Sequence, residues 1–235
     1  MSEWKKRTEI KYFVGKENLL SLHNDIQKFL PPDRNMPEIG YYFVNSIYFE
    51  NENFQILKEK QDGISLRSKY RIRNYAEDLN DFFTQSPNNL EIKKRVSTNF
   101  VKGKTTINNN ELQQTIDFKK LLIKKSDDSV YREFIAATKA KSLKPVLFVR
   151  YKRKAYLNEH LDIRATFDHD IVAGRVKTAL PYKFHPVLQR DTCIFEIKYT
   201  NYKPYWLPDI VRKYNLKQEK ISKFEAGIEK ALNLY

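Results

Sequence analysis

The segment Leu66–Tyr75 carries a cationic side chain at every second position. The cations are Arg67, Lys69, Arg71 and Arg73, and the residues between them are Ser68, Tyr70 and Ile72. Side chains alternate between the two faces of a β-strand, so this spacing puts the cations on one face. Cations in a row repel one another unless an anion or carboxylates lie among them. The segment therefore predicts a strand with an anion site on one face.

The tripeptide Glu-Ile-Lys recurs along the chain, at residues 9–11, 91–93 and 196–198. In a strand, each copy would place a carboxylate and an ammonium on one face and an isoleucine on the other. Around the third copy, a continuous apolar face is formed by Cys193, Phe195, Ile197 and Tyr199. A single half-solvated strand would show the same pattern. Its repetition instead favours a sheet with one charged face and one apolar face.

The hydrophobic pattern predicts a β-rich α+β chain that folds as one domain over residues 1–235. Strands are expected at residues 7–14, 41–49, 66–75, 90–96, 145–156, 161–167, 171–176 and 193–199. Helical segments are expected at residues 16–30, 117–142, 204–214 and 220–234, with a short helix or turn at 50–58. Strands in this order favour a curved or closed antiparallel sheet. Because the helices need apolar sheet surface to cover, the charged face would line the interior if the sheet closes.

A closed sheet with a charged interior would need an anionic ligand, because buried like charges are costly without counter-ions. A linear chain of phosphates fits this need, since arginine grips a phosphate with two hydrogen bonds and lysine acts as a point charge. The glutamates among the cations would supply hard oxygen ligands for Mg²⁺ or Mn²⁺. The interior is therefore expected to be a polar tunnel for a phosphate compound and its metal.

The net charge of +14, from 43 Lys and Arg against 29 Asp and Glu, also implies an anionic partner. Charge alone leaves nucleic acid, an acidic lipid surface and phosphate compounds open. The chain has one cysteine, Cys193, which excludes an internal disulfide and fits a reducing compartment. The N-terminal residues show no apolar signal core, and no stretch approaches the roughly 20 apolar residues of a membrane helix. We therefore expect a cytoplasmic protein.

Short motifs spread over almost the whole chain resemble those of one family. They are Lys11-Tyr12-Phe13-Val14, Ser46-Ile47-Tyr48-Phe49, Arg71-Ile72-Arg73-Asn74-Tyr75, Glu91-Ile92-Lys93, Pro145-Val146, Tyr151-Lys152-Arg153-Lys154-Ala155-Tyr156, Arg164-Ala165-Thr166-Phe167-Asp168, Phe195-Glu196-Ile197-Lys198 and Lys220-Ile221-Ser222-Lys223-Phe224. In this order they resemble the catalytic domain of the vacuolar transporter chaperone (VTC) polyphosphate polymerases, in the triphosphate tunnel metalloenzyme superfamily.

The resemblance implies a closed antiparallel tunnel, or barrel, of eight strands with helices packed on the outside. It also implies a polymerase that transfers the γ-phosphoryl group of ATP to a growing inorganic polyphosphate chain, with Mn²⁺ or Mg²⁺ as cofactor. The residues it implies as catalytic contacts to phosphate are Lys11, Arg71, Arg73, Lys93, Arg153, Arg164 and Lys223. Further phosphate contacts or tunnel neighbours are Tyr151, Lys198, Lys220, Ser222 and Glu91, and the implied metal ligand is Glu196. A membrane protein that takes up the product stays open as a partner.

One departure from related tunnel enzymes bears on the reaction. Thiamine triphosphatases and class IV adenylate cyclases begin with Glu-x-Glu-x-Lys, whereas this chain has Arg7 at the first glutamate position. The missing metal ligand favours the polymerase, but hydrolysis of tripolyphosphate or nucleoside triphosphates in the same tunnel stays open. A non-enzymatic nucleic-acid-binding protein is the second alternative. It is less favoured, because the sequence has no helix-turn-helix, zinc-finger or RNP-like motif and mixes glutamates into its basic strands.

Overall fold

The structure is a computed structural model that describes residues 5–6, 8–84, 87–97, 99–117, 127–176, 181 and 183–232. Its strands are β1 (Lys5–Lys6), β2 (Thr8–Gly15), β3 (Tyr42–Glu50), β4 (Leu66–Asn74), β5 (Asn88–Val96), β6 (Asn99–Ile107), β7 (Lys144–Asn158), β8 (Ile163–Arg175), β9 (His185–Pro186) and β10 (Thr192–Tyr199). Its α-helices are α1 (Lys16–Gln27), α2 (Gln55–Gln61), α3 (Asn109–Asp117), α4 (Ser129–Lys141), α5 (Leu207–Lys213) and α6 (Lys223–Leu232), and a 3₁₀ helix, η1, spans Asn80–Phe83. The α+β class with a β-rich antiparallel sheet is confirmed.

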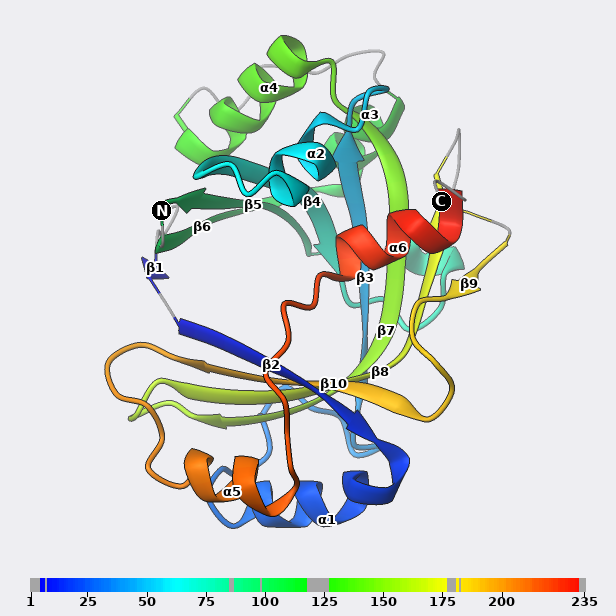
Figure 1. Cartoon of the computed structure of the whole chain (residues 1–235). Coiled ribbons are helices and arrows are strands. Elements are labelled where there is room, and N and C mark those ends of the chain that lie inside the picture. The colour runs from blue at the N-terminus through cyan, green and yellow to red at the C-terminus, as the bar shows by residue number, and fades with distance from the viewer. Residues whose placement is uncertain are drawn as a thin grey trace.

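The strands form one strongly curved antiparallel sheet in the order β1-β6-β5-β4-β3-β7-β8-β10-β2, with β9 beside β8 (Figure 1). The sheet curls back on itself, because its two end strands, β1 and β2, are one residue apart in the chain. Within the described residues no pairing joins the two ends, so a closed barrel is not confirmed. Eight of the described strands have eight or more residues, which agrees with the number that the family resemblance implies, and β1 and β9 are two-residue additions.

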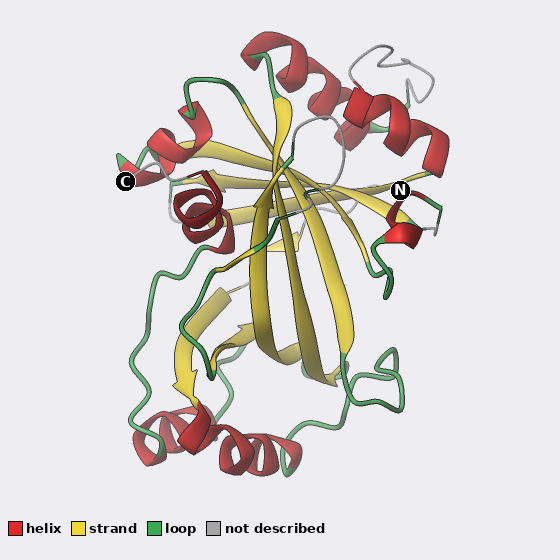
Figure 2. Cartoon of the chain, turned by 90° about the vertical axis from the view of Figure 1, so that its right-hand side faces the viewer, coloured by secondary structure: helices red, strands yellow, loops and turns green. Residues whose placement is uncertain are grey.

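Helices cover the convex, apolar face of the sheet at both ends of its long strands (Figure 2). At one end, Tyr12 and Phe195 project outward from β2 and β10 and join a buried cluster with Leu22 of α1 and Leu207 of α5. Such burial of apolar surface is the main force that holds helix to sheet. This packing follows the expected separation of charged and apolar faces.

At the other end, α4 packs over β5 and β6, and its Phe134 reaches residues of β3 and β4. The ring of Phe134 lies 5.0 Å from Phe49 and 6.2 Å from Tyr70, measured between centroids. Asp128 caps this helix by accepting hydrogen bonds from the backbone N–H groups of Val130 and Tyr131. The helical pattern expected around residues 117–142 is therefore realised from residue 129 onward.

The last helix, α6, lies on the concave face instead. A Cβ atom at Gly227 would lie 3.0 Å from the side chain of Leu147 and 3.4 Å from that of Val149. Both residues alternate along β7 with Tyr151, so they share its concave face. The expectation that helices pack only on the outside is wrong for α6, because a glycine in the helix lets it approach this strand closely.

A single bent strand, β8, replaces the two expected at 161–167 and 171–176. The pairing register with β7 shifts between Arg150 and Lys152, and Asp170 adopts a left-handed conformation with φ +49°. The extra residue of such a bulge reverses the alternation of side chains. Asp168 on one side of the bulge and Ala173 on the other therefore face the same concave surface.

Sequence patterns did not predict β6 or α3. Two parts of the expected helices, residues 118–126 with Phe118, Leu121 and Leu122, and residues 233–234, lie outside the described residues. The other expected strands and helices are present with shifted ends.

The longest helix in the described part of the chain, α4, has 13 residues. A membrane-spanning helix needs about 20 apolar residues. Among the described helices, none is long and apolar enough to cross a bilayer.

Candidate functional site

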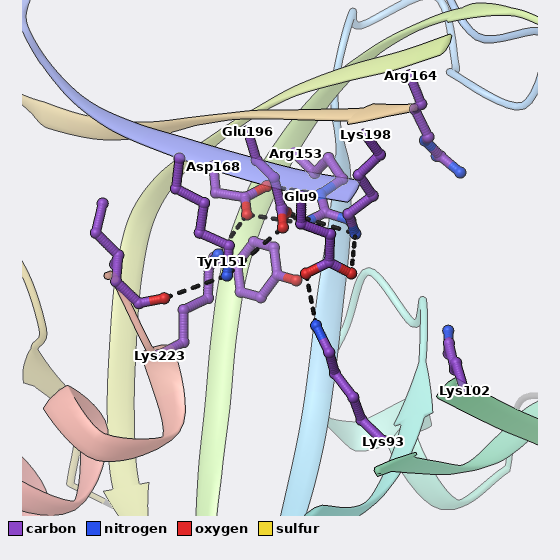
Figure 3. A network of polar contacts seen from close by, with 12 residues as sticks. Glu9, Lys93, Lys102, Tyr151, Arg153, Arg164, Asp168, Glu196, Lys198 and Lys223 are labelled. Atoms are coloured by element: carbon purple, nitrogen blue, oxygen red, sulfur yellow. Dashed lines mark hydrogen bonds and ion pairs between the residues drawn. The ribbon is translucent and has the colours of Figure 1, made fainter. Parts of the chain in front are cut away.

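Charged side chains from seven strands and α6 meet on the concave face of the sheet, and Figure 3 shows most of them. We call this group the concave cluster. Its cations are Lys11, Lys69, Arg71, Arg73, Lys93, Lys102, Arg153, Lys198 and Lys223, its carboxylates are Glu9, Glu91, Asp168 and Glu196, and Tyr151 lies among them. Nine cations thus face four carboxylates. Because the cations outnumber the carboxylates in a partly buried site, the cluster favours an anion.

Glu91 organises the part of the cluster on β4, β5 and β6. Its carboxylate accepts a hydrogen bond of 2.6 Å from Arg71 Nε and another of 2.6 Å from Lys102 Nζ. Arg71 also donates to the hydroxyl of Tyr48 at 3.2 Å. Burial alone would raise the pKa of Glu91, but Arg71, Arg73 and Lys102 outweigh it and hold the pKa well below its usual value. Glu91 therefore stays charged and fixes Arg71 in place.

Asp168 organises the part of the cluster on β7, β8 and α6, as Glu91 does on β4, β5 and β6. Arg153 donates two hydrogen bonds to its carboxylate, of 2.6 and 2.7 Å, and Lys223 Nζ lies 2.6 Å from Asp168 Oδ2. Burial would raise the pKa of Asp168, but Arg153 and Lys223 outweigh it and lower the pKa. The Lys223 ammonium also lies 4.9 Å from the ring centroid of Tyr151. The first residue of α6 is thereby tied to the wall of the sheet.

A third group spans the concave face between β2, β10 and β5. Glu196 lies 3.5 Å from both Lys11 and Lys198, while Glu9 lies 2.5 Å from Lys93 and 4.0 Å from Lys198. The Glu9–Lys93 pair joins β2 and β5, which are far apart in the order of the sheet. The sheet must therefore curl far enough to bring the concave faces of these two strands together. Burial raises the pKa of Glu9, but Lys198 and Lys93 outweigh it and lower the pKa to about 2.

Two cations of the cluster are less well neutralised than the rest. Arg73 donates to Ser46 Oγ at 3.1 Å and to the hydroxyl of Tyr151 at 3.4 Å, and its closest carboxylate contact is 4.0 Å, to Glu91. Lys69 donates to Ser222 Oγ at 3.1 Å, and no carboxylate of the described residues pairs with it. Burial and the neighbouring Lys60 and Lys11 hold the pKa of Lys69 well below its usual value. These two side chains therefore have the weakest pairing with carboxylates among the cations of the described cluster.

The structure brings together most of the residues that the sequence singled out. Those within the concave cluster are Lys11, Arg71, Arg73, Lys93, Arg153, Lys223, Tyr151, Lys198, Glu91 and Glu196. Ser222 touches the cluster through Lys69, whereas Lys220 is exposed. Arg164 points away from the other labelled side chains in Figure 3 and lies 2.7 Å from Asp33. Lys220 and Ser222 precede α6 instead of lying on it.

Four members of the cluster, Glu9, Lys69, Lys102 and Asp168, were not among the individual site residues predicted, although Lys69 was expected on the cationic face of its strand. Three of them carried a usable signal. Lys69 is two residues from Arg71, Glu9 is two residues from Lys11, and Asp168 is four residues from Arg164. Residues at these even spacings lie on the same face of a strand, so each shares its face with a residue that was predicted to belong to the site. Lys102 could not be placed, because β6 was not predicted.

The carboxylates of the cluster suit a hard metal ion only in company with phosphate. The described residues contain no group of three or more His, Cys, Asp or Glu side chains that could hold a metal ion. Mg²⁺ in phosphate-binding sites is commonly held by one or two carboxylates plus phosphate oxygens and water. Glu9 and Glu196, on the paired strands β2 and β10, match that donor chemistry. Arg7, which replaces the expected first glutamate, lies outside the described residues.

Comparison with known proteins gives one family match. The VTC domain family matches residues 6–232. A search of curated protein sequences finds no significant match. The fold is similar to that of a Bacillus halodurans protein described as a "putative adenylate cyclase", with 14% identity over 93% of this chain and 95% of that one and a TM-score of 0.56. A Vibrio parahaemolyticus protein with the same description is 11% identical, over 94% and 97% of the two chains, with a TM-score of 0.49.

Proposed function

The chain belongs to the VTC domain family, and from that premise we propose that it transfers the γ-phosphoryl group of ATP to the end of an inorganic polyphosphate chain. The observation that carries this proposal is the concave cluster, in which cations outnumber carboxylates along a single curved face. Several phosphates in a row would each attract neighbouring cations of the cluster, and this attraction would offset the repulsion between the cations themselves. Adenylate cyclase activity, which is attributed to the two structural relatives, is not proposed, because the similarity extends only to the fold.

The proposed reaction needs little from the protein beyond alignment and charge. A terminal phosphate oxygen attacks the γ-phosphorus, and the bond from that phosphorus to the oxygen bridging to the β-phosphate breaks, so that ADP leaves with the bonding electrons. The attacking oxygen is already an anion near neutral pH, so a strong general base is unnecessary. Stabilisation of charge by Arg71, Arg73, Arg153 and Lys223 would supply the main effect, as in other phosphoryl transfers.

Tyr151 would donate a hydrogen bond to a phosphate in the middle of the cluster. Its hydroxyl lies 3.4 Å from Arg73, and the Arg153 guanidinium lies 5.2 Å from its ring centroid. Burial raises the pKa of Tyr151 to about 12, although Arg153 and Arg73 act against this. The phenol therefore keeps its proton and acts as a neutral donor between two guanidinium groups.

Glu196, with Glu9 beside it, would hold Mn²⁺ or Mg²⁺ against the phosphate oxygens. When bound, the metal would neutralise part of the charge on the phosphates. The lysines that now contact these two carboxylates would then be free to contact phosphate instead.

Incubation of the purified protein with ATP and Mn²⁺, followed by separation of the products by size, tests the proposal. Long phosphate polymers together with ADP would support it. Release of orthophosphate alone would replace it with hydrolysis in the same site. Absence of turnover together with salt-sensitive oligonucleotide binding would contradict both reactions.

We expect the protein to take up protons from solution when it binds tripolyphosphate at pH 8. We expect the variant Lys102→Arg to take up fewer protons on binding the same ligand. Burial, together with the nearby Arg71 and Arg73, lowers the pKa of Lys102 to about 7 although Glu91 opposes this. A bound polyanion favours the protonated ammonium, so Lys102 gains a proton on binding, whereas an arginine is already charged. Calorimetry in buffers with different protonation enthalpies measures the uptake.

The matched control for this experiment is Lys104→Arg, which changes an exposed lysine two residues along the same strand. It should leave proton uptake at the level of the unmodified protein. Equal uptake by the unmodified protein and Lys102→Arg would show that Lys102 is already charged or lies outside the phosphate site.

A further inference from the structure

Tyr75 presents an exposed aromatic ring at one end of the concave cluster. It directly follows β4 and continues the alternation of Arg71 and Arg73. Its side chain is 47% exposed, and its ring meets that of Tyr42 at 5.7 Å between centroids and an angle of 68°. Tyr42 shares the face of Ser46 and Tyr48 on β3. The two rings therefore lie on the cationic side of the sheet.

The backbone on both sides of Tyr75 is held rigidly. Asn74 is buried and donates hydrogen bonds to the carbonyl of Phe82, at 2.8 Å, and to Asn88 Oδ1, at 3.0 Å. Ala76 is also buried, and its carbonyl accepts a hydrogen bond of 2.8 Å from Asn45. An exposed aromatic side chain between two anchored residues is a preorganised surface, because little further freedom is lost when a ligand packs against it.

Arg164 lies beside this pair of rings. Its Nη2 donates to the hydroxyl of Tyr42 at 3.0 Å and to Asp33 Oδ2 at 2.7 Å. A guanidinium and aromatic rings are the groups on which nucleobases stack in proteins. The position of Arg164, away from the rest of the cluster, has an explanation if it serves the nucleoside instead of the phosphates.

This end of the cluster lies beyond the part of β7 on which the body of α6 packs, and only the first residue of the helix, Lys223, reaches Asp168 beside Arg153. The helix packs on Leu147 of β7, whereas Tyr42 pairs with Arg153, six residues further along the same strand. Six strand residues span about 20 Å. The end marked by Tyr75 is therefore not the one that α6 covers.

We propose that Tyr75, supported by Tyr42 and Arg164, stacks against the nucleobase of ATP while Arg73 and Arg71 hold its phosphates. The spacing agrees with this, because successive residues on one strand face are about 6.6 Å apart, so base, first phosphates and later phosphates can follow one another along β4. This inference rests on the proposed function and adds a nucleoside subsite to it. Stacking tolerates any base, so ATP and GTP should bind with similar affinity.

The test compares ATP with tripolyphosphate, which has the phosphates but no base. We expect Tyr75→Ala to weaken ATP binding about 10- to 100-fold in calorimetry and to leave tripolyphosphate binding within twofold. Tyr75→Phe should restore ATP binding, because the ring is kept. Tyr205→Ala, which removes an aromatic side chain that is 83% exposed outside the cluster, should change neither ligand.

Equal weakening of ATP and tripolyphosphate by Tyr75→Ala would overturn the nucleoside subsite, since Tyr75 would then act through the phosphate site. Unchanged binding of both ligands would overturn it as well. These results differ from failure of the proposed function, which shows instead as no phosphate polymer formed from ATP by the unmodified protein.

Discussion

Arg73→Ala is expected to lower kcat/KM for phosphoryl transfer about 10²- to 10³-fold, the effect of removing one preorganised charge from a transition state. Arg73 is buried, and its nearest carboxylate contact is 4.0 Å, so its charge is largely available to a ligand. Arg71, two residues earlier, is instead held by Glu91 at 2.5 Å. Loss of Arg73 should therefore have the larger effect of the two.

Steady-state kinetics and a denaturant titration on the same preparations separate catalysis from folding. Arg67→Ala is the matched control, because it removes the same charge from the same strand outside the concave cluster, where Arg67 donates to the carbonyl of Ile64. It should keep kcat/KM within about threefold of the unmodified protein, as expected for a surface change. Full activity in Arg73→Ala would contradict the assignment of Arg73 to the site.

Asp168→Asn is expected to lower the free energy of unfolding by about 3 kcal/mol. The substitution leaves Arg153 and Lys223 charged in a buried site without the carboxylate that neutralises them. Breaking a buried ion pair on one side costs about 3–5 kcal/mol, and we expect the lower end because Glu196 lies 3.9 Å from Arg153. Urea titration measures the change. Asp170→Asn, which alters an exposed pair with Lys152, should cost less than about 1 kcal/mol.

The pH dependence of the Asp168→Asn effect has a defined sign. Because the pKa of Asp168 is depressed in the folded protein, its stabilising effect is fully present above the unfolded value of 3.8 and is lost as pH falls through the folded pKa. The difference in stability between the two proteins should be constant near neutral pH and should shrink below about pH 4. A difference that grows as the pH falls, or one below 1 kcal/mol at pH 7, would contradict the role given to the carboxylate.

Alternation along strands predicted much of the site because it is a local rule. Arg71 and Arg73 share a face of β4, and Glu91 and Lys93 share a face of β5, because the two residues of each pair are two positions apart in their strand. The same rule fails where the backbone leaves the regular repeat. At Asp170 a bulge reverses the alternation, and sequence alone gave no sign of it.

Two other features were not predictable because they depend on tertiary packing. The pattern of α6 shows that one side of the helix is apolar, but it does not show which face of the sheet that side covers. The strand β6 has Gly103 and Thr105 on the face opposite Lys102, so its sequence does not show the regular alternation of apolar and polar residues that predicts a strand. Its position in the sheet is set by pairing with β5. Lys102 enters the site only through that pairing.

Calorimetric titration with tripolyphosphate at moderate salt tests the central claim, that the concave cluster binds a chain of phosphates. We expect one tripolyphosphate per chain and a loss of affinity of about 100-fold or more in the double variant Arg71→Ala/Arg73→Ala, because two charged hydrogen-bond donors are removed, with Arg67→Ala unchanged. A single-stranded oligonucleotide should bind more weakly than tripolyphosphate and with equal affinity to all three proteins. Failure to bind tripolyphosphate, or equal binding by the double variant, would contradict the claim.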